Sequence, residues 1–286
     1  MIISDRKIRF KIKFLILNIF FFIYNFLPNR RLKKFFYITK SDKFKNYSDL
    51  YDVVQELTNK KKVKKILEIG IGGHDLDYEG GASLLALNFF FRKAKVYGLD
   101  LMNKEFLNSK RIKTFIGSQN DKKFLNNFGK KIGSFDIIID DGSHFVKHQL
   151  TSFNNLFKYL NENGIYVIED LSGSYRNSSG GDPNLSAQKN IISFFAKTVH
   201  STNSNMLIKK VLHNQKFVNF SKVFFFGRAI LVQKKTRKIK AYNNKLAFQK
   251  LSTLNKTRKK ILLHGKKIKP FKRSDGLIRF KENKSN

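Results

Sequence analysis

Acidic residues stand directly after two apolar runs in the middle of the chain. Ile137–Ile139 leads into Asp141 and His144, and Ile165–Ile168 leads into Asp170. The carboxyl ends of parallel strands open onto one edge of an α/β sheet, which is where such sheets bind their ligands. Two carboxylates and an imidazole brought together at that edge would suit a divalent metal ion with a proton acceptor beside it.

An amphipathic helix is predicted between these two strands. Its apolar residues recur at intervals of three and four: Leu150, Phe153, Leu156, Phe157 and Leu160. Asn163-Gly164 ends the helix before the second strand begins. Two interpretations stay open for Asp140, which either holds the backbone and caps the helix or binds a ligand. For His148, inside the helix, packing at the helix start is the favoured interpretation.

A glycine-rich turn follows an earlier strand. Lys65–Ile69 is predicted as that strand, and Gly70-Ile71-Gly72-Gly73 comes directly after it. Glycine lets the backbone approach a ligand because no Cβ stands in the way. A helix over 82–91 and a strand over Lys95–Asp100 complete a βαβ unit, whose terminal acid suits the ribose of a nucleoside. The dinucleotide fingerprint requires a glycine where Asp75 stands, which disfavours NAD.

The remaining patterns extend this unit into a longer α/β chain. We expect helices over 43–57, around 124–128 and over 191–199, and a strand over 111–117. Residues 176–184 are rich in Ser, Gly and Asn and are predicted as a mobile loop. Strands over 218–226 and 229–233 are expected to pair antiparallel at the end of the sheet. From residue 234 the chain is rich in Lys, which predicts a solvated or partly helical extension.

Composition limits the chemistry that the chain can perform. Cys is absent from the 286 residues, which excludes disulfides, thiolate zinc sites and cysteine nucleophiles and favours a reducing compartment, the cytoplasm. The chain holds 57 Lys and Arg against 21 Asp and Glu, a formal net charge of +36. Such a charge favours anionic partners. A compositional bias toward Lys, Asn and Phe explains the same numbers, so the charge identifies no one partner.

The N-terminal stretch is both basic and apolar. Phe14–Leu27 lies between groups of Lys and Arg, is shorter than the ~20 apolar residues of a membrane span, and contains Asn18 and Asn25. No small-residue cleavage site of a signal peptide follows it. Two alternatives are favoured equally, an interfacial helix at the inner face of a membrane with anionic headgroups or a helix buried against the main domain, and a membrane span is a third, less favoured one.

Several short motifs together resemble class I S-adenosylmethionine-dependent methyltransferases. They are LEIGIGG, GGASL, GSQND, DDGSH and YVIED, spread over Ser41–Gln233. The combination is similar to the macrocin and mycinamicin family of sugar O-methyltransferases. The resemblance implies a Rossmann-like, doubly wound, mostly parallel sheet with an antiparallel strand near its C-terminal end. It also implies three regions: a basic arm over 1–40, a methyltransferase domain over 41–233 and a basic extension over 234–286.

The resemblance also implies roles for individual residues. Those expected to bind S-adenosylmethionine are Glu68, Gly70, Gly72 and Asp100, with Gln119 or Asp121 beside the adenine. Those expected to bind Mg²⁺ are Asp141 and Asp170, with Glu79 as a third candidate. His144 is expected to take the proton from the attacking hydroxyl.

The expected function is therefore Mg²⁺-dependent methyl transfer to a hydroxyl of a sugar-containing acceptor. A glycolipid, a polysaccharide or a nucleotide sugar suits a basic chain with an apolar arm better than a macrolide does. The alternative is a non-catalytic, methyltransferase-like protein that binds anionic lipid or nucleic acid. No specific nucleic acid is expected, since an NPPY-type motif is absent from the sequence. The sequence leaves a homo-oligomer open.

Overall fold

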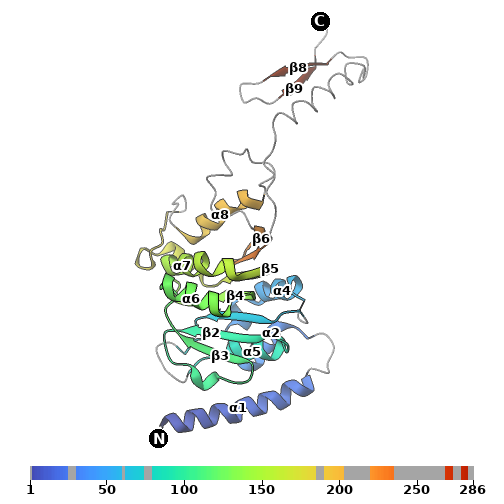
Figure 1. Ribbon diagram of the computed structural model, residues 1–286. Helices are drawn as coiled ribbons and strands as arrows, with labels where there is room; N and C mark the ends of the chain where they lie inside the picture. Colours follow the sequence, from blue (N-terminus) through green and yellow to red (C-terminus); the bar gives the residue numbers. More distant parts are fainter. Residues whose placement is uncertain are drawn as a thin grey trace. The chain divides into compact units, whose positions relative to one another are not determined.

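The computed structural model of the protein describes residues 2–24, 30–59, 62–73, 79–184, 190–202, 220–234, 268–272 and 278–282. The chain divides into two compact units, Met1–Ser204 with Gln215–Ile239 and Asn205–Asn214 with Lys240–Asn286. The first unit carries the large sheet and every site residue expected from the sequence (Figure 1).

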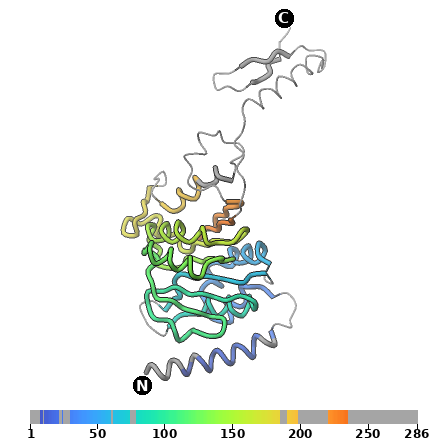
Figure 2. The backbone as a smooth tube through the Cα atoms, viewed as in Figure 1, coloured from blue at the N-terminus to red at the C-terminus, as the bar shows by residue number. Residues whose placement is uncertain are grey.

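A seven-stranded sheet forms the centre of the first unit. Its strands lie in the order β3 (Ile112–Ile116), β2 (Lys95–Asp100), β1 (Lys65–Ile69), β4 (Phe135–Asp140), β5 (Leu160–Ile168), β7 (Ile230–Lys234) and β6 (Phe220–Phe225). The first five run parallel, and β7 is antiparallel to both of its neighbours. Figure 2 shows segments distant in sequence, such as β1 and β4, lying side by side.

Helices cover both faces of the sheet. In chain order they are α1 (Ile2–Tyr24), α2 (Leu32–Thr39), α3 (Lys43–Asn46), α4 (Ser48–Leu57), α5 (Ala82–Phe90), α6 (Lys122–Ile132), α7 (Val146–Leu156) and α8 (Ile191–Thr202). Short 3₁₀ turns are η1 (Glu105–Leu107), η2 (Phe157–Tyr159), η3 (Leu171–Tyr175) and η4 (Asn177–Ser179).

Alternating side chains of the strands explain why the sheet needs cover on two sides. Ile137 and Ile139 belong to a buried cluster with residues of α1, α2, α4 and α5. Ile138 points to the opposite face, into a second cluster with residues of α6, α7 and α8. Because both faces are apolar, each must be buried against helices, and a three-layer α/β arrangement results.

The register aligns the carboxyl ends of the central strands. Ile69 of β1 pairs with Asp140 of β4, and Asp140 pairs with Ile168 of β5. The glycine turn after β1 and the acidic residues after β4 and β5 therefore meet at one edge. The expectation drawn from the parallel arrangement is confirmed.

Most elements agree with the sequence patterns, and three differ. The helix expected over 43–57 is two helices with a break at Tyr47. The helix before β5 ends earlier, because η2 and the start of β5 precede Asn163, which has a left-handed φ of 59°. In the C-terminal extension, β8 (Ile268–Lys272) and β9 (Ile278–Glu282) pair antiparallel, so these ten residues are strands and not the partly helical structure expected there.

The N-terminal helix α1 packs against the first unit on one side, as the buried alternative predicts, and its contact with a membrane stays a prediction. Leu17 and Phe21 of α1 and Phe35 of α2 belong to the core of the first unit, although residues 1–40 were set apart as an arm. On the other side of α1, several large apolar side chains are exposed. Among the described residues, no helix has both the length and the apolar character needed to cross a membrane.

Candidate functional site

A cavity of about 670 Å³ lies at the carboxyl ends of β1, β2 and β4. The glycine turn, the end of β2 and the loop after β4 contribute most of its lining. Of the residues expected to form the site, the cavity is lined by Gly70, Gly72, Asp100, Gln119, Asp141 and His144. Residues remote in sequence thus share one cavity because their strands end at the same edge.

The turn after β1 can be made only by a glycine at its first position. Gly70 has a φ of 80°, and a Cβ on it would stand 2.1 Å from the carbonyl oxygen of Asp141. Gly72 has a φ of 72°, and a Cβ on it would stand 4.0 Å from the Cα of Gly80. The first glycine lets the two loops approach each other, and the second leaves the cavity wall without a side chain.

Asp100 holds the glycine turn from the neighbouring strand. Its Oδ2 accepts a hydrogen bond from the backbone N–H of Ile71 at 2.8 Å, and its Oδ1 accepts one from that of Met102 at 2.9 Å. A carboxylate oxygen can accept more than one hydrogen bond. The half-buried Asp100 therefore keeps acceptor capacity toward a ligand in the cavity it lines.

Gln119 and Asp140 fix the loop that carries His144. The backbone N–H of Ser143 donates to Gln119 Oε1 at 2.7 Å, and Gln119 Nε2 donates to Asp140 Oδ1 at 3.1 Å. Asp140 is fully buried and also accepts a hydrogen bond from the Ser152 hydroxyl. Burial raises its pKa to about 7, although these hydrogen bonds oppose the shift. Asp140 thus has the backbone-holding role, and it does not line the cavity.

Two histidines line the cavity on this loop and the following helix. His144 has a left-handed φ of 60°, and its Nδ1 is buried without a hydrogen-bond partner among the described residues. His148 Nδ1 lies 2.7 Å from the Ser143 hydroxyl oxygen. Burial and the neighbouring Lys147 lower the pKa of His148. The expectation for His148 was packing only, and its place in the cavity wall was missed.

Beside the cavity, carboxylates surround one buried ammonium group. We call Glu68, Asp141 and Glu169, with Lys43 between them, the acid edge. Lys43 Nζ lies 2.6 Å from Asp141 Oδ2, 2.6 Å from Glu169 Oε2 and 3.4 Å from Glu68 Oε1. Burial raises the pKa of Glu169 to about 8 and that of Glu68 to about 7, and the Lys43 charge opposes both shifts.

Tyrosines and an arginine complete the surroundings of the acid edge. Tyr51 donates its hydroxyl hydrogen to Glu169 Oε1, and Tyr47 accepts a hydrogen bond from the Asp170 backbone N–H at 3.1 Å. Arg228 approaches Asp170 Oδ2 at 3.4 Å. Partial burial alone would raise the pKa of Asp170, but hydrogen bonds with Ser172 and the nearby His144 and Arg228 lower it.

Four expected site residues lie outside the cavity lining. Glu68 is buried in the acid edge, and Asp121 caps α6 by accepting a hydrogen bond from the Phe124 backbone N–H at 3.0 Å. Asp170 caps the start of η3 beside the acid edge, and Glu79 is exposed next to Gly80. The roles expected of these four stay predictions.

The donor set expected for a metal ion does not come together in this conformation. Within the described ranges, no three His, Asp or Glu side chains are grouped as a metal site would require. Asp141 contacts the ammonium of Lys43 instead. The expected ligands Asp141, Asp170 and Glu79 thus do not fit a divalent ion as they stand.

Lys43, Tyr51 and Glu169 were missed by sequence reasoning. Glu169 was visible as an acid directly after a strand, next to Asp170. Nothing in the local pattern of Lys43 distinguishes it from the many other Lys of the chain. Its partners lie 98 and 126 residues away, so only the fold reveals the pairing.

Comparison with known proteins gives relatives for part of the chain. No protein-family model matches. Mycinamicin VI 2''-O-methyltransferase of Micromonospora griseorubida is 44% identical over 117 residues, which are 41% of this chain and 29% of that protein. Demethylmacrocin O-methyltransferase of Streptomyces fradiae is 45% identical over 118 residues, 41% of this chain and 30% of that protein. The matched segment thus spans under a third of the length of these curated relatives.

A solved structure matches more of the chain. The MycE methyltransferase of the mycinamycin biosynthetic pathway, in complex with Mg, SAH and mycinamycin VI, superposes with a TM-score of 0.67 at 26% identity. The match covers 76% of this chain and 58% of that one. The predicted class I methyltransferase fold is confirmed by this match and by the strand order. The resemblance to the macrocin and mycinamicin sugar O-methyltransferases is confirmed as well.

Proposed function

We propose that this chain transfers the methyl group of S-adenosylmethionine to a hydroxyl of a sugar-containing acceptor. The observation that carries the proposal is a single cavity that combines the Gly70 turn, the Asp100 carboxylate and His144, whose buried Nδ1 has no hydrogen-bond partner in the part of the chain that the structure describes. The O-methyltransferases of mycinamicin VI and of demethylmacrocin, which are 44% and 45% identical to segments of 117 and 118 residues of this chain, support the proposal.

The residues of the cavity suit the cofactor. Because Gly70 and Gly72 carry no side chains, a ligand can approach the backbone of the turn closely. The Asp100 carboxylate offers oxygens that accept hydrogen bonds from ribose hydroxyls. When bound, S-adenosylmethionine supplies an electrophilic methyl group on a positively charged sulfur. The residues that line the cavity therefore support binding of S-adenosylmethionine at the carboxyl ends of the strands.

His144 is the group that we assign to the proton. The acceptor oxygen attacks the methyl carbon, the carbon–sulfur bond breaks and its electron pair stays on sulfur. The hydroxyl proton passes to the His144 imidazole, which lines the same cavity. Gln119 and Asp140 contribute by holding the loop that carries His144.

We infer Mg²⁺ as a second cofactor, because the MycE structure contains Mg and the carboxylates of Asp141 and Asp170 follow adjacent strands. Their present geometry forms no metal site, so no step is assigned to the metal. Excess EDTA should abolish methyl transfer while calorimetry still detects S-adenosylhomocysteine. Full activity in EDTA would refute the requirement for a metal.

The experiment for the proposed function measures cofactor binding and transfer separately. S-adenosylhomocysteine should bind and NAD should not, and Asp100→Ala should weaken binding by about 1–3 kcal/mol, the loss expected for a charged hydrogen bond. His144→Ala should keep cofactor binding but lose about 10²–10⁴-fold in transfer rate, the range for a general base. Methyl transfer to sugar acceptors, including nucleotide sugars and glycolipids, is followed with labelled S-adenosylmethionine. NAD binding without S-adenosylhomocysteine binding would refute the proposal.

Peripheral contact with an anionic membrane is the second part of the proposal. The apolar side chains on the outer side of α1 are between 45% and 61% exposed: Ile8, Ile12, Leu15, Ile16, Ile19 and Phe20. Their spacing of three and four residues places them on one stripe of the helix. Arg9, Lys11 and Lys13 are exposed beside the stripe. An interfacial helix has this combination of apolar and basic residues.

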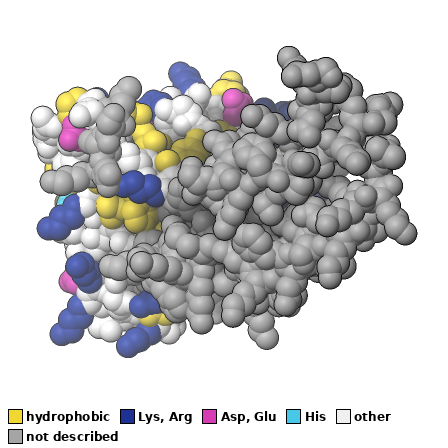
Figure 3. Space-filling view, turned by 90° about the horizontal axis from the view of Figure 1, so that it is seen from above, with side chains coloured by type: hydrophobic (Ala, Val, Ile, Leu, Met, Phe, Trp, Pro, Cys, Tyr) yellow, Lys and Arg dark blue, Asp and Glu magenta, His cyan; other side chains and the backbone are white. Residues whose placement is uncertain are grey.

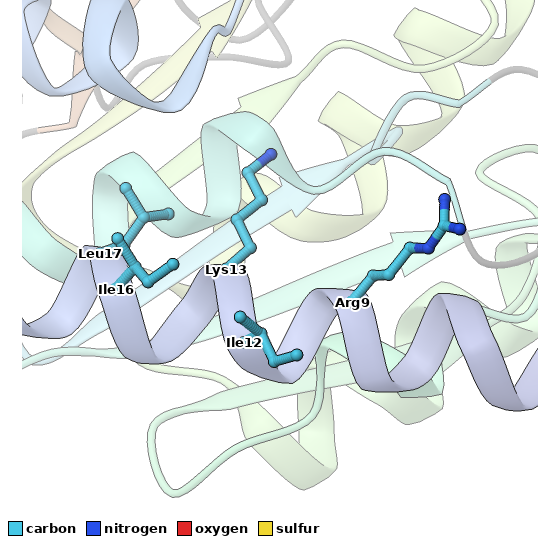
Figure 4. A pocket seen from close by; sticks show the side chains of 5 residues that line it. All are labelled: Arg9, Ile12, Lys13, Ile16 and Leu17. Atoms are coloured by element: carbon cyan, nitrogen blue, oxygen red, sulfur yellow. The ribbon is translucent and has the colours of Figure 1, made fainter.

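The surface along α1 is shaped by the same residues. Arg9, Ile12, Lys13, Ile16 and Leu17 line a groove of about 300 Å³, and Figure 4 shows Arg9 and Lys13 extending to the same side of the helix. On the face seen in Figure 3, Lys and Arg also stand out on the described surface, and few Asp or Glu do. A second copy of this chain would bring the same net charge of +36, so an anionic bilayer fits the stripe better.

Flotation with liposomes tests this contact at the inner face of the membrane. We expect the protein to float with anionic but not with neutral vesicles, and less so at high salt, because salt screens the basic groups. The double substitution Ile12→Glu with Ile16→Glu should abolish flotation. Unchanged flotation of that variant, or a dimer in solution that the variant dissolves, would contradict the membrane assignment.

A further inference from the structure

The acid edge already contains a cation of the protein's own. Lys43 is 1% exposed, and its ammonium contacts three carboxylates that end three strands of the sheet. Glu68 is fully buried, and the ammonium 3.4 Å from its Oε1 supplies its countercharge. A buried carboxylate without a countercharge is strongly destabilising, so Lys43 keeps this edge folded.

Lys43 reaches the acid edge from outside the sheet. It is the first residue of α3, and its neighbour Asp42 lines the cavity. The following helix α4 supplies Tyr51, which donates to Glu169. The segment from α3 to α4 is thereby anchored to the ends of β4 and β5 by groups that pair with acidic side chains.

A divalent ion bound at Asp141 Oδ2 would take the position of this ammonium. Lys43 Nζ lies 2.6 Å from Asp141 Oδ2, and Mg²⁺ would bind a carboxylate oxygen at about 2.0–2.1 Å. Two cations on one oxygen repel each other. A metal ion that binds Asp141 Oδ2 must therefore displace the ammonium from it.

We propose that Lys43 is an intramolecular counter-cation that competes with the divalent metal ion for Asp141. The inference rests on the proposed function, because that function places the metal at Asp141. In the metal-free protein the ammonium holds the acids together, and metal binding releases the α3 end of the segment. Lys43 is thus a positioning residue that couples α3 to the occupancy of the metal site.

Direct metal binding to the full chain tests the competition without any turnover. Mn²⁺ binding is measured by electron paramagnetic resonance for the wild type, Lys43→Met and Lys43→Arg. We expect Lys43→Met to bind Mn²⁺ at least about tenfold more tightly, because the repelling charge is gone, and Lys43→Arg to bind no more tightly than the wild type. Mg²⁺ should also raise the melting temperature of Lys43→Met more than that of the wild type.

Lys33→Met provides the matched control. Lys33 forms an ion pair with Asp52 at 2.7 Å between α2 and α4, away from the acid edge. Its loss should leave Mn²⁺ affinity unchanged. If Lys43→Met bound Mn²⁺ as tightly as the wild type or more weakly, the inference about Lys43 would be overturned and the proposed function would stand. If neither the wild type nor Lys43→Met bound Mn²⁺, both the inference and the metal part of the proposed function would be overturned. Binding of S-adenosylhomocysteine is tested separately and would be unaffected by that result.

A measurement on the wild type guards against a variant that does not fold. Hydrogen–deuterium exchange is followed in Lys43–Asn46 and Ser48–Leu57 with and without saturating Mn²⁺. Displacement of the ammonium should speed exchange in the first of these helices. Unchanged or slower exchange there, with Mn²⁺ bound, would overturn the competition.

Discussion

At the scale of single residues, Gly70 joins the two loops that enclose the cavity. The backbone N–H of Gly70 donates to the carbonyl of Leu99, and that of Asp141 donates to the carbonyl of Ile69. A side chain on Gly70 would collide with the Asp141 carbonyl and thus with the loop that carries His144. The glycine motif therefore serves loop packing as well as access for a ligand.

We predict that Gly70→Ala destabilises the protein more than Gly180→Ala. Both positions have positive φ, 80° and 74°, and an L-residue there costs about 1–2 kcal/mol. A Cβ on Gly180 meets nothing within 4 Å, whereas one on Gly70 meets backbone at 2.1 Å. Overpacking adds about 1–3 kcal/mol at Gly70 alone. Denaturant unfolding measures both, and equal losses would show that the loops have no need of close approach.

His148 gives a pH dependence with a definite sign. Burial and Lys147 lower its pKa in the folded state, while the unfolded chain titrates near the ordinary value of about 6.5. The unfolded state then binds more protons, so stability is lost as the pH falls through about 6.5. Between pH 7.5 and pH 5 the wild type should lose more unfolding free energy than His148→Gln. If the wild type and His148→Gln lost the same unfolding free energy over this pH range, the predicted role of His148 would be contradicted.

At the scale of elements, α1 presents two different faces. Phe21 is 1% exposed and stacks on Phe35 and Phe89, with ring centroids 4.7 and 4.4 Å away. Phe20, the preceding residue, is 45% exposed. One helix thus contributes to the core and also carries the apolar stripe that we assign to a membrane.

Substitution of these two neighbours should separate the two roles. Phe21→Ala removes a buried ring and should cost about 3–5 kcal/mol of unfolding free energy. Phe20→Ala should change stability by no more than about 0.5 kcal/mol, as for most surface positions, and should reduce flotation with anionic liposomes. Thermal melts and flotation are run on both. Loss of stability in Phe20→Ala would show that the outer face is covered within the protein.

At the scale of the whole molecule, the candidate site lies within one of the two compact units. Every residue assigned to cofactor, proton transfer or metal lies in the unit formed by Met1–Ser204 and Gln215–Ile239. A chain ending after residue 239 should therefore keep the melting temperature and the S-adenosylhomocysteine affinity of the full chain. Calorimetry and thermal melts check both. A marked loss of affinity would assign the C-terminal unit a part in the site.

The sequence by itself determined the features that depend on neighbouring residues. The strand ends at Asp100, Asp140 and Ile168, the glycine turn and the helix before β5 follow from apolar periodicity and turn chemistry, which act over a few residues. The parallel arrangement then placed Gly70, Asp100, Asp141 and His144 at one edge, because parallel strands end together.

Only the tertiary structure decided which of these groups meet at atomic distance. Gln119 lines the cavity while Asp121, two residues later, caps a helix, because the loop after β3 turns one side chain inward and the other toward α6. Lys43 joins the acid edge across 98 and 126 residues, and no local pattern encodes such a pairing. The two faces of α1 differ for the same reason: burial depends on what the fold places opposite each side chain, and a periodic pattern does not specify that.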